Sequence, residues 1–258
     1  SPGIERIFSW SSIDSNSRVV ILASILLICS IPHSTGQETI TGWNEAESWT
    51  DHDLNAAIIH GELVWVFGDS GIVRFSEDSG ATWQNHTNLG DVDLISADSY
   101  ENTMVVLSTD GIIYMKDELE SEWITIDSSQ TGMKSIALAG EESLIIVGNE
   151  GAIWHYTDQT WLNRTTSFTE NLRDVDFNGA DDGLAVGNAG TILATDNGGT
   201  TWDYREAPDP ESSIVSVSYF NPYRMFAVSD SGQIIYSTTP GGFEWRLREI
   251  ESAGYNTT

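Results

Sequence analysis

The chain has 258 residues, of which 40% are apolar and ten are tryptophan, so it can bury a substantial core despite its charge. The formal charge is −28, from 39 acidic against 11 basic residues, and residues 1–36 carry none of this excess. A surface with this much negative charge repels phosphate backbones and acidic lipid headgroups, which argues against a nucleic-acid partner.

Residues 1–36 are predicted to be a targeting segment, and residues 37–258 a single repeat domain. Residues 19–31 (VVILASILLICSI) contain no charge, and thirteen residues fit the apolar region of a signal peptide better than a membrane span. An uncleaved signal anchor is the alternative, in which case this segment alone meets the membrane. Either way the domain is expected outside the cytoplasm, secreted or anchored at the cell surface. The single cysteine, Cys29, lies in this segment, which excludes disulfides and thiol chemistry in the repeat domain.

Two residue types recur through the domain at nearly the same interval. Glycines at steps of 40, 40, 39 and 42 residues are Gly71, Gly111, Gly151, Gly190 and Gly232. Tryptophans at steps of 40, 38, 41 and 43 are Trp83, Trp123, Trp161, Trp202 and Trp245. Self-similarity at about 40 to 50 residues, with short strands inside each unit, is typical of propeller blades rather than of helical solenoids.

Each unit contains four strand-like pieces, clearest in the fourth as LRDVDFNG, GLAVGN, GTILATD and TTWDYRE. Short alternating segments bounded by Gly, Asp or Asn predict antiparallel strands joined by hairpins, and no segment has a helical period. The predicted fold is an all-β propeller with five visible four-stranded blades. Trp43 lies 40 residues before Trp83 and would belong to the outer strand of a further blade. We therefore expect a truncated six- to eight-bladed ring, with closure at five blades as the alternative.

Two units contain an Asp box. The pattern S-x-D-x-G-x-T-W is complete in the first, as Ser76, Asp78, Gly80, Thr82 and Trp83, and the fourth repeats it with Asn197 for the aspartate. A short polar side chain in a turn accepts backbone N–H bonds, glycine supplies a positive φ, and the tryptophan packs between sheets. The box is therefore interpreted as a hairpin stabiliser rather than a reaction centre.

With these motifs, the stretch VGNAGTILATDNGGTTW and the preceding NLRDVDF resemble the repeats of the photosystem II stability and assembly factor propellers, within the wider group of Asp-box proteins. The resemblance covers about residues 40–250 and is most specific in the first and fourth units. It implies a β-propeller that serves as an exported, non-enzymatic platform for a protein partner or a cell-surface complex, without a cofactor. The partner's identity stays open, because fold does not fix function.

The family's photosynthetic members carry an arginine-rich patch on one face. Counting 17 residues back from each recurrent glycine predicts equivalent first-strand positions at Leu54, Leu94, Lys134, Arg173 and Val215. Lys134 and Arg173 are thus the candidate binding residues, and on neighbouring blades they could hold a carboxylate or another anion. The alternative is that each pairs with a nearby acid such as Asp174.

Sialidase-like enzymes share the Asp box, so a glycoside hydrolase or a glycan-binding propeller is the competing hypothesis. Such enzymes hold a substrate carboxylate with three arginines. Here Arg164, Arg205 and Arg246 follow the repeat tryptophans and are expected on outer strands, away from the axis. A structural blade array within a longer surface protein is a third possibility.

Metal and modification sites have weaker signals. The histidines (His33, His52, His60, His86 and His155) are dispersed, and turns such as Asp181-Asp182-Gly183 lack the alternation of a calcium loop, so no metal site is predicted. Asn85, Asn163 and Asn256 begin glycosylation sequons, which export would make accessible to modification.

Overall fold

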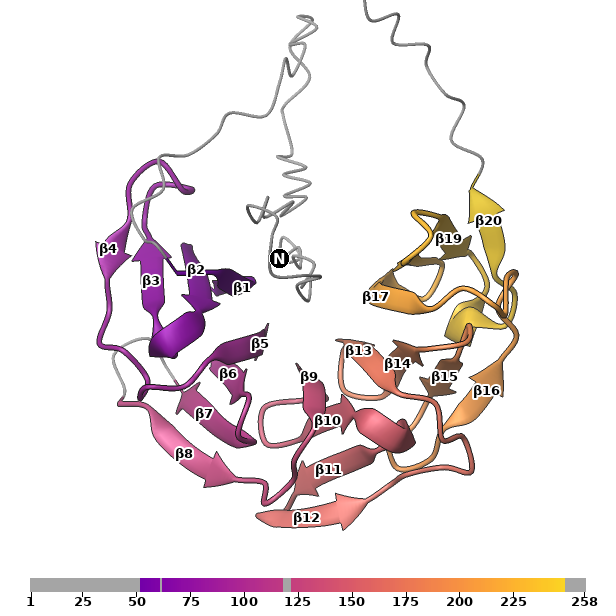
Figure 1. The fold of residues 1–258 in the computed structure, drawn as a ribbon, viewed down its shortest axis with the longest axis horizontal. Coiled ribbons are helices and arrows are strands. Elements are labelled where there is room, and N and C mark those ends of the chain that lie inside the picture. Colours follow the sequence, from indigo (N-terminus) through magenta and orange to yellow (C-terminus); the bar gives the residue numbers. More distant parts are fainter. Residues whose placement is uncertain (1–51, 61, 118–121, 249–258) are drawn as a thin grey trace, which may run out of the picture.

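The protein folds into five antiparallel sheets that stand side by side around a common centre (Figure 1). The structure is a computed structural model, and it describes residues 52–60, 62–117 and 122–248. In each sheet the four strands follow one another in space as they do in the sequence. The all-β propeller with five four-stranded blades is therefore confirmed.

The blades divide the described chain into five consecutive stretches. Blade one contains β1 (Leu54–His60), β2 (Leu63–Gly68), β3 (Val73–Ser76) and β4 (Gln84–Asn85). Blade two contains β5 (Leu94–Tyr100), β6 (Thr103–Ser108), β7 (Ile112–Asp117) and β8 (Ile124–Asp127). Blade three contains β9 (Met133–Leu138), β10 (Leu144–Gly148), β11 (Ile153–Thr157) and β12 (Thr160–Asn163). Blade four contains β13 (Leu172–Asn178), β14 (Asp182–Gly187), β15 (Ile192–Thr195) and β16 (Asp203–Arg205). Blade five contains β17 (Ile214–Asn221), β18 (Arg224–Ser229), β19 (Ile234–Ser237) and β20 (Arg246–Arg248).

The helical content of the described residues is three short 3₁₀ turns, η1 (Asp69–Gly71), η2 (Asn149–Gly151) and η3 (Pro240–Gly242). The first two contain the recurrent glycine. In blade four the corresponding Gly190 has a φ of +61°, and a Cβ there would meet the Cα of Pro210 at 2.7 Å. The turn before this glycine also places Ala189, an exposed residue, in the left-handed region with a φ of 50°. In blades one to four the repeat glycine thus marks a turn where a side chain lacks both space and an easy backbone conformation, whereas at Gly232 of blade five the backbone alone, with a φ of +78°, favours glycine.

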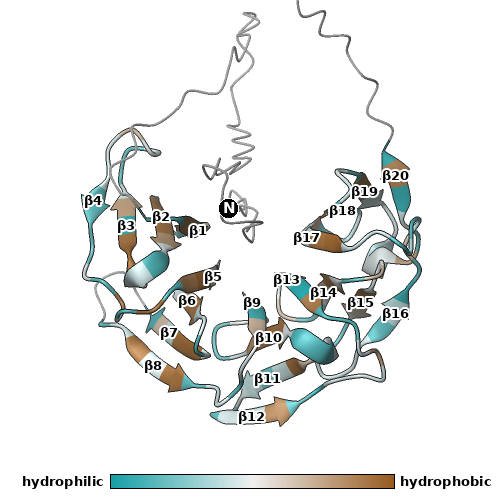
Figure 2. Ribbon diagram, viewed as in Figure 1, coloured by the Kyte–Doolittle hydropathy of each residue, from teal (hydrophilic) through white to brown (hydrophobic). Residues whose placement is uncertain are grey.

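The five blades form an arc that is open between blade one and blade five, and the first strand of every blade lies nearest the centre (Figure 1). That further blades complete a ring stays a prediction, and Trp43 lies outside the described residues. The middle strands are hydrophobic while β4 at the rim is hydrophilic (Figure 2). This gradient follows burial, because β6 and β10 are buried along their whole length whereas both residues of β4 are exposed.

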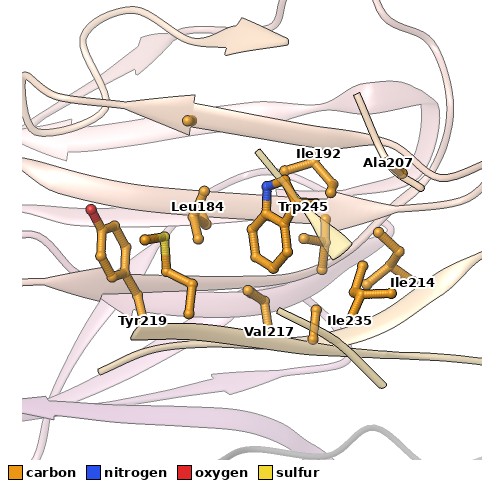
Figure 3. Packing of buried hydrophobic residues seen from close by; sticks show 12 residues of the cluster. Leu184, Ile192, Ala207, Ile214, Val217, Tyr219, Ile235 and Trp245 are labelled. Atoms are coloured by element: carbon orange, nitrogen blue, oxygen red, sulfur yellow. The ribbon is translucent and has the colours of Figure 1, made fainter. Parts of the chain in front are cut away.

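The core consists of four apolar clusters, each between two neighbouring blades. In the cluster between blades four and five, Leu184 and Ile192 of one sheet face Val217, Tyr219 and Ile235 of the next (Figure 3). The blades are therefore held by face-to-face burial of strand side chains, which is the main favourable term in folding.

The recurrent tryptophans pack between neighbouring sheets, as the sequence predicts, and the neighbour is the preceding blade. Trp245 joins the cluster with blade four (Figure 3) and Trp202 the cluster with blade three. The Trp161 Nε1 donates to the carbonyl of Asp127 in blade two at 3.2 Å, and Trp123 meets Phe67 of blade one edge-on at 6.3 Å. Trp83, in blade one, is half-buried. The prediction is confirmed for four of the five repeats.

Polar side chains of one blade also cap the inner strand of the next. An innermost strand pairs on one side only, so backbone N–H groups on its other edge need acceptors. The N–H of Leu138 donates to the Asp98 carboxylate at 2.8 Å, and the N–H of Tyr219 donates to the Asp176 carboxylate at 2.7 Å. These bonds join blade two to blade three and blade four to blade five near the axis.

Candidate functional site

Every inner strand has an irregularity directly after its first residue, which shifts the register against the second strand. The extra residues at these five bulges are Asn55, Ile95, Lys134, Arg173 and Val215. Both candidate binding residues thus occupy the same structural position on adjacent blades. A bulge changes the direction of a side chain and is common next to binding sites.

The predicted equivalence of Leu54 and Leu94 with Lys134 and Arg173 is wrong by one residue, because Leu54 and Leu94 precede their bulges. The cause is hairpin length. In blade four, Asn178 pairs with Asp182 across three residues, whereas in blade two, Tyr100 pairs with Thr103 across two. Counting back from the glycine therefore reaches different positions in the two blades.

Two of the bulged side chains bond to the loop between the second and third strands. Arg173 is half-buried, and its Nε donates to Asn188 Oδ1 at 2.6 Å. Asn55 makes the corresponding bond in blade one, where its Nδ2 donates to Asp69 Oδ1 at 2.9 Å. Because Asn188 engages only Nε, it orients the guanidinium and leaves the terminal nitrogens for a ligand's oxygens. Lys134 is exposed at the same level of the neighbouring blade.

The predicted pairing of Arg173 with Asp174 is wrong. Asp174 follows the bulge and points into the interior between blades, where it is 4% exposed. Its Oδ1 accepts from Ser135 Oγ (2.8 Å) and its own blade's Val175 N–H (3.0 Å). Its Oδ2 accepts from Ser216 Oγ (2.8 Å) and the Val217 N–H (2.9 Å). One carboxylate therefore links blades three, four and five.

Burial raises the pKa of Asp174 to about 6, although the hydrogen bonds from Val217, Ser135, Ser216 and Val175 favour the ionised form. Sequence reasoning missed this role. Once the bulges align the five inner strands, an acid is seen to replace the small residues found at this position in the other blades, which are Ala56, Ser96, Ser135 and Ser216. A charged residue at a position that otherwise takes Ala or Ser indicates a specific polar network.

The Asp boxes are local braces, as predicted. Asp78 Oδ1 accepts from Ser76 Oγ at 2.8 Å and from the Thr82 N–H at 2.7 Å, while Oδ2 accepts from Thr82 Oγ1 at 2.6 Å. The Thr82 hydroxyl is the largest of the causes that lower the pKa of Asp78 to about 2. In blade four Asn197 Oδ1 takes the same place, accepting from the Thr201 N–H at 2.9 Å. An amide serves as well as a carboxylate, which fits a structural role.

The arginines that a sialidase-like clamp would need lie on different strands. Arg205 and Arg246 are on the outer strands β16 and β20, and Arg164 follows the outer strand β12, as predicted. Arg173 is on the inner strand β13. Each outer arginine belongs to a different blade, so these three do not converge on one anion.

The remaining sequence candidates take separate places. Among the described residues no group of three or more metal-ligating side chains is close enough to hold an ion. His155 is buried and its Nε2 lies 2.8 Å from Ser143 Oγ. Asn85 and Asn163 are exposed on outer strands, whereas Asn256 lies outside the described residues. No helix within residues 52–248 has the length and apolar character to span a bilayer.

The fold and part of the sequence resemble known proteins. The family model described as Photosynthesis system II assembly factor YCF48 matches residues 154–253. The structure of YCF48 from Cyanidioschyzon merolae overlaps with a TM-score of 0.53 at 14% identity, over 78% of this chain and 86% of that one. A structure described as YCF48 bound to D1 peptide covers 76% and 82% at 17% identity, but its TM-score of 0.43 is too low to support an argument.

A propeller of lower sequence identity overlaps with a higher TM-score. The RRP9 WD40 repeats match with a TM-score of 0.60 at 12% identity, over 73% of this chain and 62% of that one. At such identity the likeness concerns the fold alone. No curated protein matches the chain in sequence.

Proposed function

We propose that this chain, an Asp-box β-propeller that resembles the photosystem II assembly factor YCF48, is an exported, non-enzymatic scaffold that binds a protein partner. The matched family is described as an assembly factor, and assembly requires binding of other proteins rather than conversion of a substrate. The Asp boxes are the motif shared with hydrolases, and here their Asp78 and Asn197 side chains accept hydrogen bonds within their own hairpins.

The observation that carries this proposal is the pair Lys134 and Arg173. In the described part of the chain they are the two basic residues on inner strands, and the strands that carry them, β9 and β13, are neighbours. Each follows the first residue of its inner strand, so the two positions lie at the same end of the propeller. On a domain this acidic, two adjacent cations form a local site for a carboxylate of the partner.

The test is charge reversal at this pair in the exported protein of the native host. Lys134→Glu with Arg173→Glu should abolish chemical cross-linking to a partner that the wild type captures reproducibly, and elevated salt should weaken the same capture. Arg164→Glu, directly after the outer strand β12, is the matched control and should leave capture intact. Undiminished cross-linking by the double variant would contradict the proposed site.

The alternative is a sialidase-like hydrolase or a glycan-binding propeller, which shares the Asp box. Release of a fluorogenic leaving group from a sialoside, or retention on immobilised acidic glycans, would favour it over the scaffold. We expect neither, because Arg164, Arg205 and Arg246 lie on three different blades.

Export and glycosylation are further parts of this proposal. Asn85 and Asn163 are exposed, and Asn163 Oδ1 accepts from the Thr165 N–H at 2.8 Å in a turn that presents the amide. Mass spectrometry of protein secreted by the native host should show a glycan at Asn85 or Asn163. Protein confined to the cytoplasm of that host would refute export.

A further inference from the structure

A hydrogen bond joins the two bulges that carry Lys134 and Arg173. Ser135 follows Lys134 and Asp174 follows Arg173, and the Ser135 Oγ donates to Asp174 Oδ1 at 2.8 Å. Both of these side chains are buried, at 2% and 4% exposure. A hydroxyl bond to a carboxylate is strong where water is excluded. The two candidate cations therefore lie on backbone segments that are bonded directly to each other.

The backbone on either side of the bulges is held as well. Before the bulges, Met133 and Leu172 are buried, at 5% and 0% exposure. After the bulge of blade four, the Val175 N–H lies 3.0 Å from Asp174 Oδ1 and 3.4 Å from Ser135 Oγ. Blades three and four lie away from the opening of the arc, and each has a described blade on both sides (Figure 1). The bonds that connect the two bulges are thus formed wholly within the described residues.

A second bond of the same kind reaches Asp174 from blade five. The Ser216 Oγ donates to Asp174 Oδ2 at 2.8 Å, so this serine matches Ser135 in chemistry, distance and burial. However, Ser216 follows Val215, which is the apolar bulge residue of its blade. Of the two bonds, only the one from Ser135 connects bulges that both carry a cation.

The ends of the two cations suit two carboxylates better than one. Asn188 accepts from the Arg173 Nε, which leaves the two terminal nitrogens side by side for both oxygens of one carboxylate. Lys134 is exposed on the neighbouring inner strand, and its ammonium is a separate point charge. A carboxylate that is paired with the guanidinium leaves Lys134 for a second acid. Two acids of one segment bind both cations best when the distance between the bulges is fixed.

We propose that Lys134 and Arg173 select a partner segment with two adjacent carboxylates, and that the bond from Ser135 to Asp174 sets the distance between the two cations. Arg173 binds one carboxylate through its terminal nitrogens, and Lys134 binds the other. Ser135 and Asp174 are positioning residues, because they are buried and act through the residues before them. This selectivity rests on the proposed function, in which the pair binds a carboxylate of the partner.

The test uses the full chain and two fluorescent six-residue peptides, one with two adjacent aspartates and one with asparagine for the second aspartate. Fluorescence anisotropy at low salt should show that the wild type binds the two-acid peptide at least about tenfold more tightly, because a second charge-assisted bond forms. Lys134→Glu with Arg173→Glu should reverse this preference, since the remaining surface is acidic. Equal affinity of the wild type for both peptides would overturn the proposal.

Two matched variants test the role of the buried bond. Ser135→Ala removes the donor of blade three, while Val175 continues to hold the same oxygen of Asp174. This variant should lower the preference to about threefold or less, yet bind the one-acid peptide within about twofold of wild type. Ser216→Ala removes an equally short bond to the same carboxylate and should keep the full preference. An equal loss of preference in both variants would show a merely structural role and contradict the positioning.

A milder variant covers the case in which Ser135→Ala does not fold. Ser135→Cys nearly keeps the size of the side chain and weakens the donor, so it should also lower the preference for the two-acid peptide. Full preference in a folded Ser135→Ala or Ser135→Cys protein would refute the positioning.

Failure of the proposed function gives a different pattern. If the purified chain selects the two-acid peptide but captures no partner in the native host, the scaffold function is wrong while the selective site stands. If Lys134→Glu with Arg173→Glu leaves the binding of both peptides unchanged, the site is wrong and the selectivity is wrong with it.

Discussion

Replacing Asp174 with asparagine should alter the pH dependence of stability. Burial raises the folded-state pKa of this carboxyl to about 6, above the usual 3.8. A raised folded-state pKa contributes stability that is fully present below pH 3.8 and is lost as the pH rises through 6. The shift of about two pH units corresponds to about 3 kcal/mol of unfolding free energy lost between pH 4 and pH 8. The neutral amide of Asp174→Asn lacks this loss.

The amide has a cost of its own. Its nitrogen cannot accept a hydrogen bond, so one of the N–H groups of Val175 and Val217 loses its acceptor, at about 1–3 kcal/mol. The wild type should therefore be more stable than the variant at pH 4, and the variant should equal or exceed it at pH 8.

Urea unfolding of both proteins at several pH values, followed by tryptophan fluorescence, gives the difference directly. Taking the difference removes the contribution of the other carboxylates, which is common to both proteins. Asp98→Asn is the matched control on a half-buried carboxylate that accepts from Leu138. Parallel stability curves for wild type and Asp174→Asn would refute the reasoning. A wild-type advantage that grows with pH would show that the four hydrogen bonds outweigh burial.

Three further predictions concern the repeat itself. Trp202→Ala should lower the free energy of unfolding by about 3–5 kcal/mol, because the indole is buried between blades three and four, and the half-buried Trp83→Ala should cost less in the same urea titration. Ala189→Gly should raise stability by about 1 kcal/mol, since it relieves a left-handed backbone, whereas Ala180→Gly, in an exposed turn without a positive φ, should not. Asp78→Ala should lower the melting temperature at pH 7, and this effect should disappear toward pH 2. The pKa of Asp78 is lowered to about 2, so the stability that its carboxylate contributes is present above pH 3.8 and is lost as the pH falls through 2.

The repeat period was sufficient to predict most of the fold. The interval of about 40 residues between tryptophans predicted five blades, and the pieces around Leu172 and Leu184 lie in strands β13 and β14 within a residue or two of the predicted bounds. Such agreement is expected where every local signal repeats, since turn residues, alternation and the recurrent indole all indicate the same unit.

The details that depend on contacts between blades could not be predicted. The five bulges at the inner strands have no local sequence signature, because Asn55, Ile95 and Lys134 share no property. The role of Asp174 depends on serines about 40 residues away on both sides, Ser135 and Ser216, and only the stacking of sheets brings them together.

Each described blade is one uninterrupted length of polypeptide, with β13 followed directly by β14, β15 and β16. When the domain is stretched from its ends in optical tweezers, its extension should therefore increase stepwise, and each step should correspond to the unfolding of one sheet. Asp174 is hydrogen-bonded to both neighbouring blades. Blades three, four and five should therefore unfold together in one larger step below pH 6, and in separate steps above it.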